Sequence, residues 1–302
     1  MKQTILGFAF LLAATPAGAQ HEHQAQQPAA AAAAGQPAAV SLAIPPPEKM
    51  DDSIPAAAEF VTIALEKSPR HAEWIDVPLA NSVPTKAWVV YPETKSRTGV
   101  VIVVHENRGL NDWARAVADQ IAEDGFIAIA VDLLSGKGPG GGNTDSIPPA
   151  EIGKVFSSLQ RAEINARLDR VREYAIQLPA ANGRVGMVGF CWGGGTVFQY
   201  AIHQPALNAA VVYYGPAPQE PALIERIAAP ILGMFGEDDA RVNTTIDPVL
   251  AILNKDRTRF TTHMFAGAGH GFLRQQFGRE ANLRAAERAW PLTLSFFGEH
   301  LK

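Results

Sequence analysis

The chain has 302 residues, of which 47% are hydrophobic and 19% charged, a composition typical of a folded globular protein and unlike a disordered, collagen-like or coiled-coil chain. Its 26 Lys and Arg residues against 30 Asp and Glu residues give a formal charge of -4, which leaves no basic surplus for phosphates, so we expect no nucleic-acid partner. The single cysteine excludes a disulfide framework, a Cys-rich zinc site and iron–sulfur ligation. We expect one main domain and a monomer.

Residues 1–19 have the features of a secretory signal peptide. Lys2 precedes a short apolar run at residues 5–14, and Ala17-Gly18-Ala19 provides a small-residue cleavage site. The run is too short to cross a hydrocarbon core of about 30 Å, and no later segment has roughly 18 uninterrupted apolar residues. We therefore expect cleavage after Ala19 and an exported protein, periplasmic or secreted, with no stable membrane span. A buried N-terminal helix is the alternative.

The next segment, residues 20–57, is dominated by Ala, Gln and Pro and has no sustained amphipathic period. Such a segment buries too little apolar surface to offset its ordering entropy. We expect a disordered tether, followed by a folded domain over residues 58–302.

Short β-branched runs alternate with helical patterns from about residue 60 onward, which predicts an α/β fold with a mostly parallel sheet and helices on both faces. A helical period extends over residues 151–178, a shorter helix opens at Asp247-Pro248, and a last helix covers residues 279–300 with a kink expected at Pro291. The expected strands are residues 87–91, 100–104, 127–131, 185–189, 210–214, 231–235 and 261–265.

The stretch Gly189-Phe190-Cys191-Trp192-Gly193 joins an expected strand to an expected helix. It has the nucleophile-elbow pattern G-x-S-x-G with cysteine in place of serine. The tight turn would expose the Cys191 sulfur at the carboxyl edge of the sheet, where the N-terminus of the following helix stabilises a thiolate. A glycine-rich turn around a structural cysteine is the alternative interpretation.

An acid and a histidine follow in the order that this architecture requires. Glu237-Asp238-Asp239 comes after one strand, where a carboxylate can accept from an imidazole N–H, and His270 lies in a glycine-rich loop after the next strand. Each alone is typical of a solvated loop. Their joint occurrence beyond two successive strands favours a catalytic site.

These three segments resemble the dienelactone hydrolase (carboxymethylenebutenolidase) family, and the resemblance extends from about residue 60 to the C-terminus. It implies an α/β-hydrolase fold and a Cys-His-Asp triad of Cys191, His270 and Asp239, with Asp238 as the alternative acid. It also implies hydrolysis of carboxylic esters or lactones through an acyl-thioester, without a cofactor or a metal.

The resemblance includes the segment from Val103 to Leu110. Glu106 matches the family's glutamate that contacts the resting thiol, and a nearby carboxylate can accept from an S–H. The backbone N–H groups of Asn107 and Trp192 would form the oxyanion hole. An ordinary loop carboxylate is the alternative for Glu106.

Three cationic side chains are candidates for binding the substrate. Arg274 matches the family's arginine that binds a substrate carboxylate, and a guanidinium suits that task. The family's second arginine has no clear match, so Lys137 and Arg108 are the remaining candidates. His105 could compete as the base or suggest a metal pair. An esterase or acyltransferase of different acyl specificity, or a non-catalytic exported binding or scaffold protein, are the alternative functions.

Overall fold

The computed structural model describes residues 43–80, 82–255 and 259–302. The expected signal peptide and residues 20–42 of the expected tether lie outside the described residues. The described part belongs to one compact unit, which begins at Ser41 and ends at Lys302.

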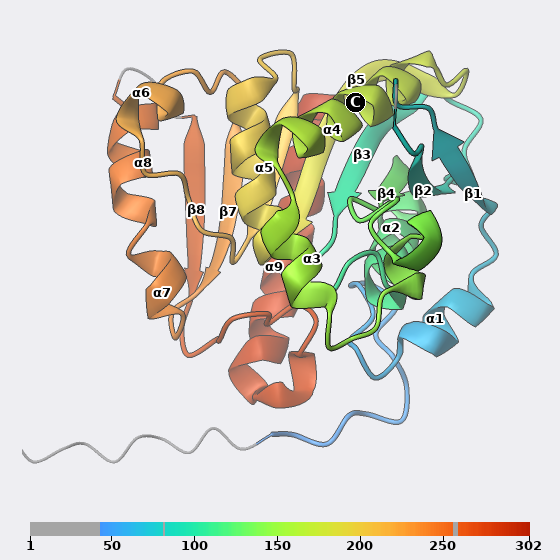
Figure 1. The fold of residues 1–302 in the computed structure, drawn as a ribbon. Helices are drawn as coiled ribbons and strands as arrows, with labels where there is room; N and C mark the ends of the chain where they lie inside the picture. Colours follow the sequence, from blue (N-terminus) through green and yellow to red (C-terminus); the bar gives the residue numbers. More distant parts are fainter. Residues whose placement is uncertain (1–42, 81, 256–258) are drawn as a thin grey trace, which may run out of the picture. The chain divides into compact units, whose positions relative to one another are not determined.

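An eight-stranded sheet runs through this unit in the order β1-β2-β4-β3-β5-β6-β7-β8 (Figure 1). The β1–β2 and β2–β4 pairs are antiparallel, and all the others are parallel, so the carboxyl ends of β3 to β8 meet at the lower edge in Figure 1. The predicted α/β fold is confirmed, as is each of the seven expected strands. The strands are β1 (Ala72–Val77), β2 (Thr85–Val90), β3 (Thr98–Val104), β4 (Ile127–Val131), β5 (Ala181–Phe190), β6 (Ala209–Tyr213), β7 (Ile231–Gly236) and β8 (Phe260–Phe265).

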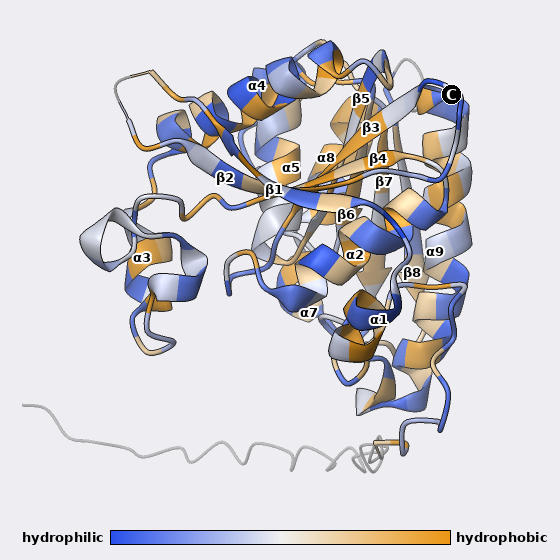
Figure 2. Ribbon diagram, turned by 90° about the vertical axis from the view of Figure 1, so that its right-hand side faces the viewer, coloured by the Kyte–Doolittle hydropathy of each residue, from blue (hydrophilic) through white to orange (hydrophobic). Residues whose placement is uncertain are grey.

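Helices cover both faces of the sheet (Figures 1 and 2). The α-helices are α1 (Val61–Lys67), α2 (Asp112–Glu123), α3 (Ile152–Ser158), α4 (Arg161–Gln177), α5 (Trp192–His203), α6 (Pro221–Ile224), α7 (Ala240–Asn243), α8 (Ile246–Leu253) and α9 (Glu280–Leu301). Short 3-10 turns occur at η1 (Pro139–Gly141), η2 (Thr144–Ser146) and η3 (Gln276–Gly278).

Two hydrophobic clusters, one on each side of the sheet, form the core. Along β3, Val100, Ile102 and Val104 pack with α4, α5 and α8, whereas Val101 and Val103 pack with α2 and α9. This alternation is the period-2 geometry of a strand covered on both faces. None of the helices that the structure describes has the length and hydrophobicity of a membrane span.

The expected helix over residues 151–178 is instead two helices, because Leu159 and the following residue are extended. The hydroxyls of Ser157 and Ser158 bond the carbonyls of Gly153 and Val155, and such local bonds compete with helix continuation. Helix α4 buries its predicted apolar face, but α3 buries no residue. Helix α9 continues through Pro291.

The expected tether is too long, because its last residues pack on the domain. Ile54 and Ala57 are buried. The Trp113 side chain donates to the Ala56 carbonyl (3.1 Å), and Gln276 donates to the Pro55 carbonyl (2.7 Å). Apolar side chains near residue 57 therefore have a surface to bury against, which the composition of the whole segment did not reveal.

Candidate active site

Cys191 occupies a sharp turn between β5 and α5. Its backbone has φ 55° and ψ -117°, a left-handed conformation that a non-glycine residue adopts only where the surroundings hold it. Its N–H donates to the Tyr213 carbonyl (3.0 Å). A Cβ on Gly189 would lie 2.3 Å from the Gly193 carbonyl oxygen, so this turn requires glycine. The geometry is that of the predicted nucleophile elbow, with a partly exposed thiol.

The first turn of α5 touches the end of β3. A Cβ on Gly193 would lie 2.4 Å from the carbonyl oxygens of both Val104 and His105. This contact brings the segment that carries Glu106 and Asn107 to the nucleophile elbow. Asn107 is exposed, and its N–H donates to no acceptor among the described residues.

His270 and Asp239 meet beyond the ends of β8 and β7. The His270 Nδ1 lies 2.5 Å from an Asp239 carboxylate oxygen, and Asp239 is buried. The pKa of His270 is raised to about 9, first by a hydrogen bond with the Cys191 side chain and then by Asp239, while burial opposes the increase. Asp238 instead pairs with Arg279 (2.6 Å), so Asp239 is the carboxylate that orients the imidazole.

Glu106 is buried and pairs with Arg274, whose Nε lies 2.7 Å from the carboxylate. Burial raises the pKa of Glu106, and the charges of Arg274, His270 and Arg108 oppose that increase. The expected contact of this carboxylate with the resting thiol is not the one observed. A guanidinium is a charged and stronger donor than an S–H, and it holds the carboxylate.

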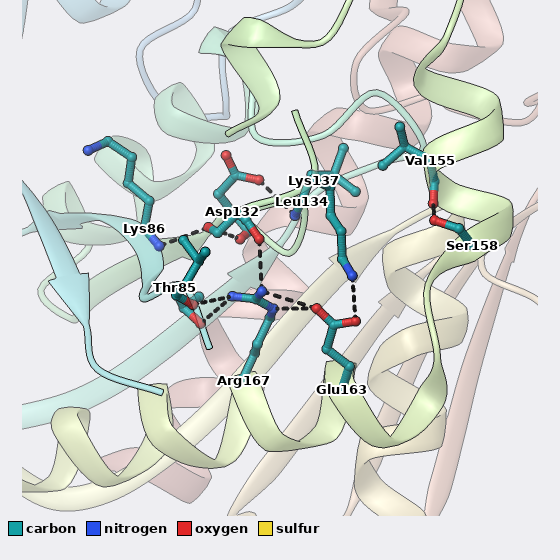
Figure 3. A network of polar contacts seen from close by, with 11 residues as sticks. Thr85, Lys86, Asp132, Leu134, Lys137, Val155, Ser158, Glu163 and Arg167 are labelled. Carbon is teal, nitrogen blue, oxygen red and sulfur yellow. Dashed lines mark hydrogen bonds and ion pairs between the residues drawn. The ribbon is translucent and has the colours of Figure 1, made fainter. Parts of the chain in front are cut away.

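The two other cations expected to bind substrate, Arg108 and Lys137, differ in whether their charge is free to contact a substrate. Arg108 is exposed beside Glu106. Lys137 pairs with Glu163 (2.7 Å), which also accepts from the buried Arg167 (Figure 3). Lys137 therefore anchors the loop after β4 to α4, and we do not assign it to the substrate site.

His105, the alternative base or metal ligand, is fully buried with both ring nitrogens engaged. Nδ1 lies 2.7 Å from the Glu106 carbonyl oxygen, and Nε2 lies 3.3 Å from the Leu133 nitrogen. Burial lowers the pKa of His105, and the charge of Asp132 opposes that decrease. No group of three or more potential metal-binding side chains occurs in the described ranges.

Two aromatic features of the site were not expected from the sequence. Tyr214 follows β6 with φ 40°, its ring lies 5.1 Å from that of His270, and its buried hydroxyl has no partner within the described chain. Burial, and then the charges of Glu106 and Cys191, place its pKa well above the ordinary value. Phe156 of α3 packs edge-on against Trp192, with ring centroids 4.8 Å apart. The motif Tyr213-Tyr214-Gly215 at the end of a strand was the sequence feature that could have indicated Tyr214 as a residue of the site.

Comparison with known proteins identifies relatives of this chain. Two curated relatives, from Saccharolobus solfataricus and Escherichia coli K12, are named "Putative carboxymethylenebutenolidase". The first is 29% identical over 70% of this chain and 92% of its own length, and the second is 28% identical over 67% and 77%.

Solved structures share the fold. A dienelactone hydrolase-like promiscuous phosphotriesterase from metagenomic libraries superposes with a TM-score of 0.66 at 24% identity, over 77% of this chain and 99% of that one. Dienelactone hydrolase from Anabaena variabilis gives 0.61 at 21%, over the same shares. An acylaminoacyl peptidase from Pyrococcus horikoshii gives 0.62 at 16%, over 80% of this chain and 44% of the peptidase. The model of the Dienelactone hydrolase family matches residues 85–301, and the chain belongs to that family.

Proposed function

We propose that this protein hydrolyses small carboxylic esters or lactones through a Cys191–His270–Asp239 triad, without a cofactor. The observation that carries the proposal is the 2.5 Å contact between His270 and Asp239, and the pKa of the same imidazole is raised chiefly by the side chain of Cys191, which lies in a strained elbow. A nucleophile, a base in contact with it and a group that orients the base are the parts that acyl transfer requires.

In the first half-reaction, His270 takes the thiol proton and the Cys191 sulfur attacks the acyl carbon. The raised pKa of His270 supports its role as the proton acceptor. As the C–O bond breaks, the imidazolium gives its proton to the departing alkoxide. For a lactone this opens the ring, and the new hydroxyl stays attached to the acyl group.

In the second half-reaction, His270 takes a proton from water, and the resulting hydroxide attacks the thioester. The C–S bond breaks, the imidazolium returns its proton to the Cys191 sulfur, and the free acid leaves. The N–H groups of Asn107 and Trp192 would hold the oxyanion in both steps, each contributing on the order of 3 kcal/mol. The Trp192 N–H opens α5 and therefore has no acceptor within the helix.

The charges around the nucleophile favour an acyl group that carries a carboxylate. Arg274 uses Nε for Glu106, and its terminal N–H groups bond no other residue in the described ranges, which leaves them available to an anion. The exposed Arg108 adds a second cation near the same carboxylate. Trp192 and Phe156 would contact an apolar part of the substrate.

The test is a panel of lactones and simple esters, with and without a carboxylate, assayed on the purified protein and on Cys191→Ala. We expect saturable turnover by the parent and none by the variant. Unchanged turnover in the variant would exclude the mechanism. Absence of turnover across the panel would favour a binding or scaffold role, and faster reaction with an added alcohol acceptor than with water would favour an acyltransferase.

A further inference from the structure

His105 is a buried histidine whose hydrogen bonds assign its tautomer. The Glu106 carbonyl can only accept, so Nδ1 carries the proton, and the Leu133 N–H can only donate, so Nε2 carries the lone pair. Both ring nitrogens are therefore used. A neutral ring held in this way cannot act as the base, yet it lies two residues before Asn107, one of the proposed oxyanion donors.

The carbonyl that His105 holds belongs to the peptide group of the proposed oxyanion donor. The Glu106 C=O and the Asn107 N–H are parts of one planar unit, and in a trans peptide they point in opposite directions. The same carbonyl accepts from the Gly109 N–H at 3.3 Å, a longer bond than the 2.7 Å bond from His105. The imidazole therefore makes the shorter contact that orients the Asn107 N–H.

The same ring contacts the residue that carries the other donor. The His105 imidazole stacks on the Trp192 indole, with centroids 5.7 Å apart and planes within 10°. Phe156 packs edge-on against both rings. One side chain thus contacts the Trp192 ring and the peptide group that carries the Asn107 N–H.

The far end of the imidazole is fixed to a rigid loop. Leu133, which donates to Nε2, follows Asp132, whose buried carboxylate accepts from the Leu134 N–H (2.9 Å) and from the Thr144 hydroxyl (2.7 Å). Thr144 accepts in turn from the Leu110 N–H at 3.2 Å. These bonds tie the loop after β4 to the loop after β3, so His105 has a fixed support.

We propose that His105 is a positioning residue of the oxyanion hole: its Nδ1–H holds the Glu106 carbonyl so that the Asn107 N–H points at the developing oxyanion. The inference rests on the proposed ester hydrolysis. It assigns His105 no proton transfer and no contact with substrate.

Two substitutions separate the hydrogen bonds from the shape of the side chain. His105→Phe keeps a planar ring against Trp192 but loses both hydrogen bonds. His105→Gln loses the ring but offers one donor and one acceptor. Tyr200→Phe is the matched control, because it removes the hydrogen bond from the buried Tyr200 of α5 to Asp169 and leaves the His105 ring and the Glu106 carbonyl untouched.

We expect His105→Phe to lower kcat/KM for an ester by about 10²-fold, the cost of losing one oxyanion donor, mostly through kcat. Its affinity for an aldehyde that forms a hemithioacetal with Cys191 should fall by a similar factor. His105→Gln should recover most of both losses, and Tyr200→Phe should lose little. Alkylation of Cys191 by iodoacetamide forms no oxyanion, so its rate should be unchanged in all three variants.

The inference is overturned if the parent turns ester over through Cys191 but His105→Phe keeps parental kcat/KM and aldehyde affinity. It is also overturned if Tyr200→Phe loses as much as His105→Phe. Loss of activity in His105→Gln with an altered pH profile would instead make His105 a base. A parent that does not turn ester over refutes the proposed function.

A measurement on the parent protein covers the case in which the variants do not fold. Nitrogen-15 NMR should find His105 as a neutral Nδ1–H tautomer that does not titrate at neutral pH, and aldehyde binding should shift the Asn107 amide proton. An Nε2–H ring, or an Asn107 amide that does not respond, would contradict the inference.

Discussion

Gly193→Ala tests whether the contact between α5 and β3 sets the geometry of the site. The new Cβ would lie 2.4 Å from the carbonyl oxygens of Val104 and His105. The helix start or the strand end must move by about 1 Å to restore an ordinary contact. A displacement of that size at a catalytic constellation costs about 10²-fold in rate.

The matched control is Gly195→Ala, two residues along the same helix. Its Cβ would meet Pro216 at 3.3 Å, which a small adjustment relieves. We expect kcat/KM for a chromogenic ester to fall about 10²-fold in Gly193→Ala and to change little in Gly195→Ala. Circular dichroism and thermal unfolding would show that both variants fold. Parental kcat/KM in Gly193→Ala, or an equal loss in the control, would refute the reasoning.

Three further predictions concern the triad and the N-terminus. Asp239→Asn should lower the pKa of His270 and reduce kcat/KM by about 10³-fold or more, whereas Asp238→Asn should leave kcat/KM unchanged. Steady-state kinetics of both variants across pH would check these two expectations. The pKa of His270 is raised from 6.5 to about 9, chiefly by Cys191, so protonation of His270 stabilises the fold fully below pH 6.5 and this contribution is lost as pH rises toward 9. Between pH 6.5 and 9, urea unfolding should show a steeper fall in the free energy of unfolding for the parent than for His270→Gln. Equal slopes would contradict the raised pKa of His270. Export with cleavage after Ala19 predicts that the mature protein isolated from its source begins at Gln20, and an intact N-terminus would refute it.

The fold was largely predictable because β-branched runs and glycine-flanked turns repeat along the chain. Strand β1 was missed since it lies at the edge of the sheet with most of its residues at least partly exposed, which leaves no alternating pattern. The division between α3 and α4 falls just after Ser157 and Ser158, whose side chains bond helix carbonyls although the apolar period continues.

The site was predictable where chemistry depends on local motifs and not where it depends on long-range pairing. The elbow around Cys191 and the order of acid and base follow from local spacing. The pairing of Glu106 with Arg274 joins residues 168 apart in sequence, and no local pattern encodes it. The sequence also left Asp238 as an alternative, and the structure separates the two carboxylates, because Asp239 contacts His270 whereas Asp238 pairs with Arg279.

The nucleophilic role of Cys191 is the central claim, and the chain offers a direct test because this is its only cysteine. Residual ester turnover would be measured against the fraction of Cys191 alkylated by iodoacetamide, with peptide mass spectrometry locating the modification. If Cys191 is the nucleophile, turnover falls along a straight line that reaches zero at one alkyl group per chain. Substantial turnover by the fully alkylated protein would contradict it.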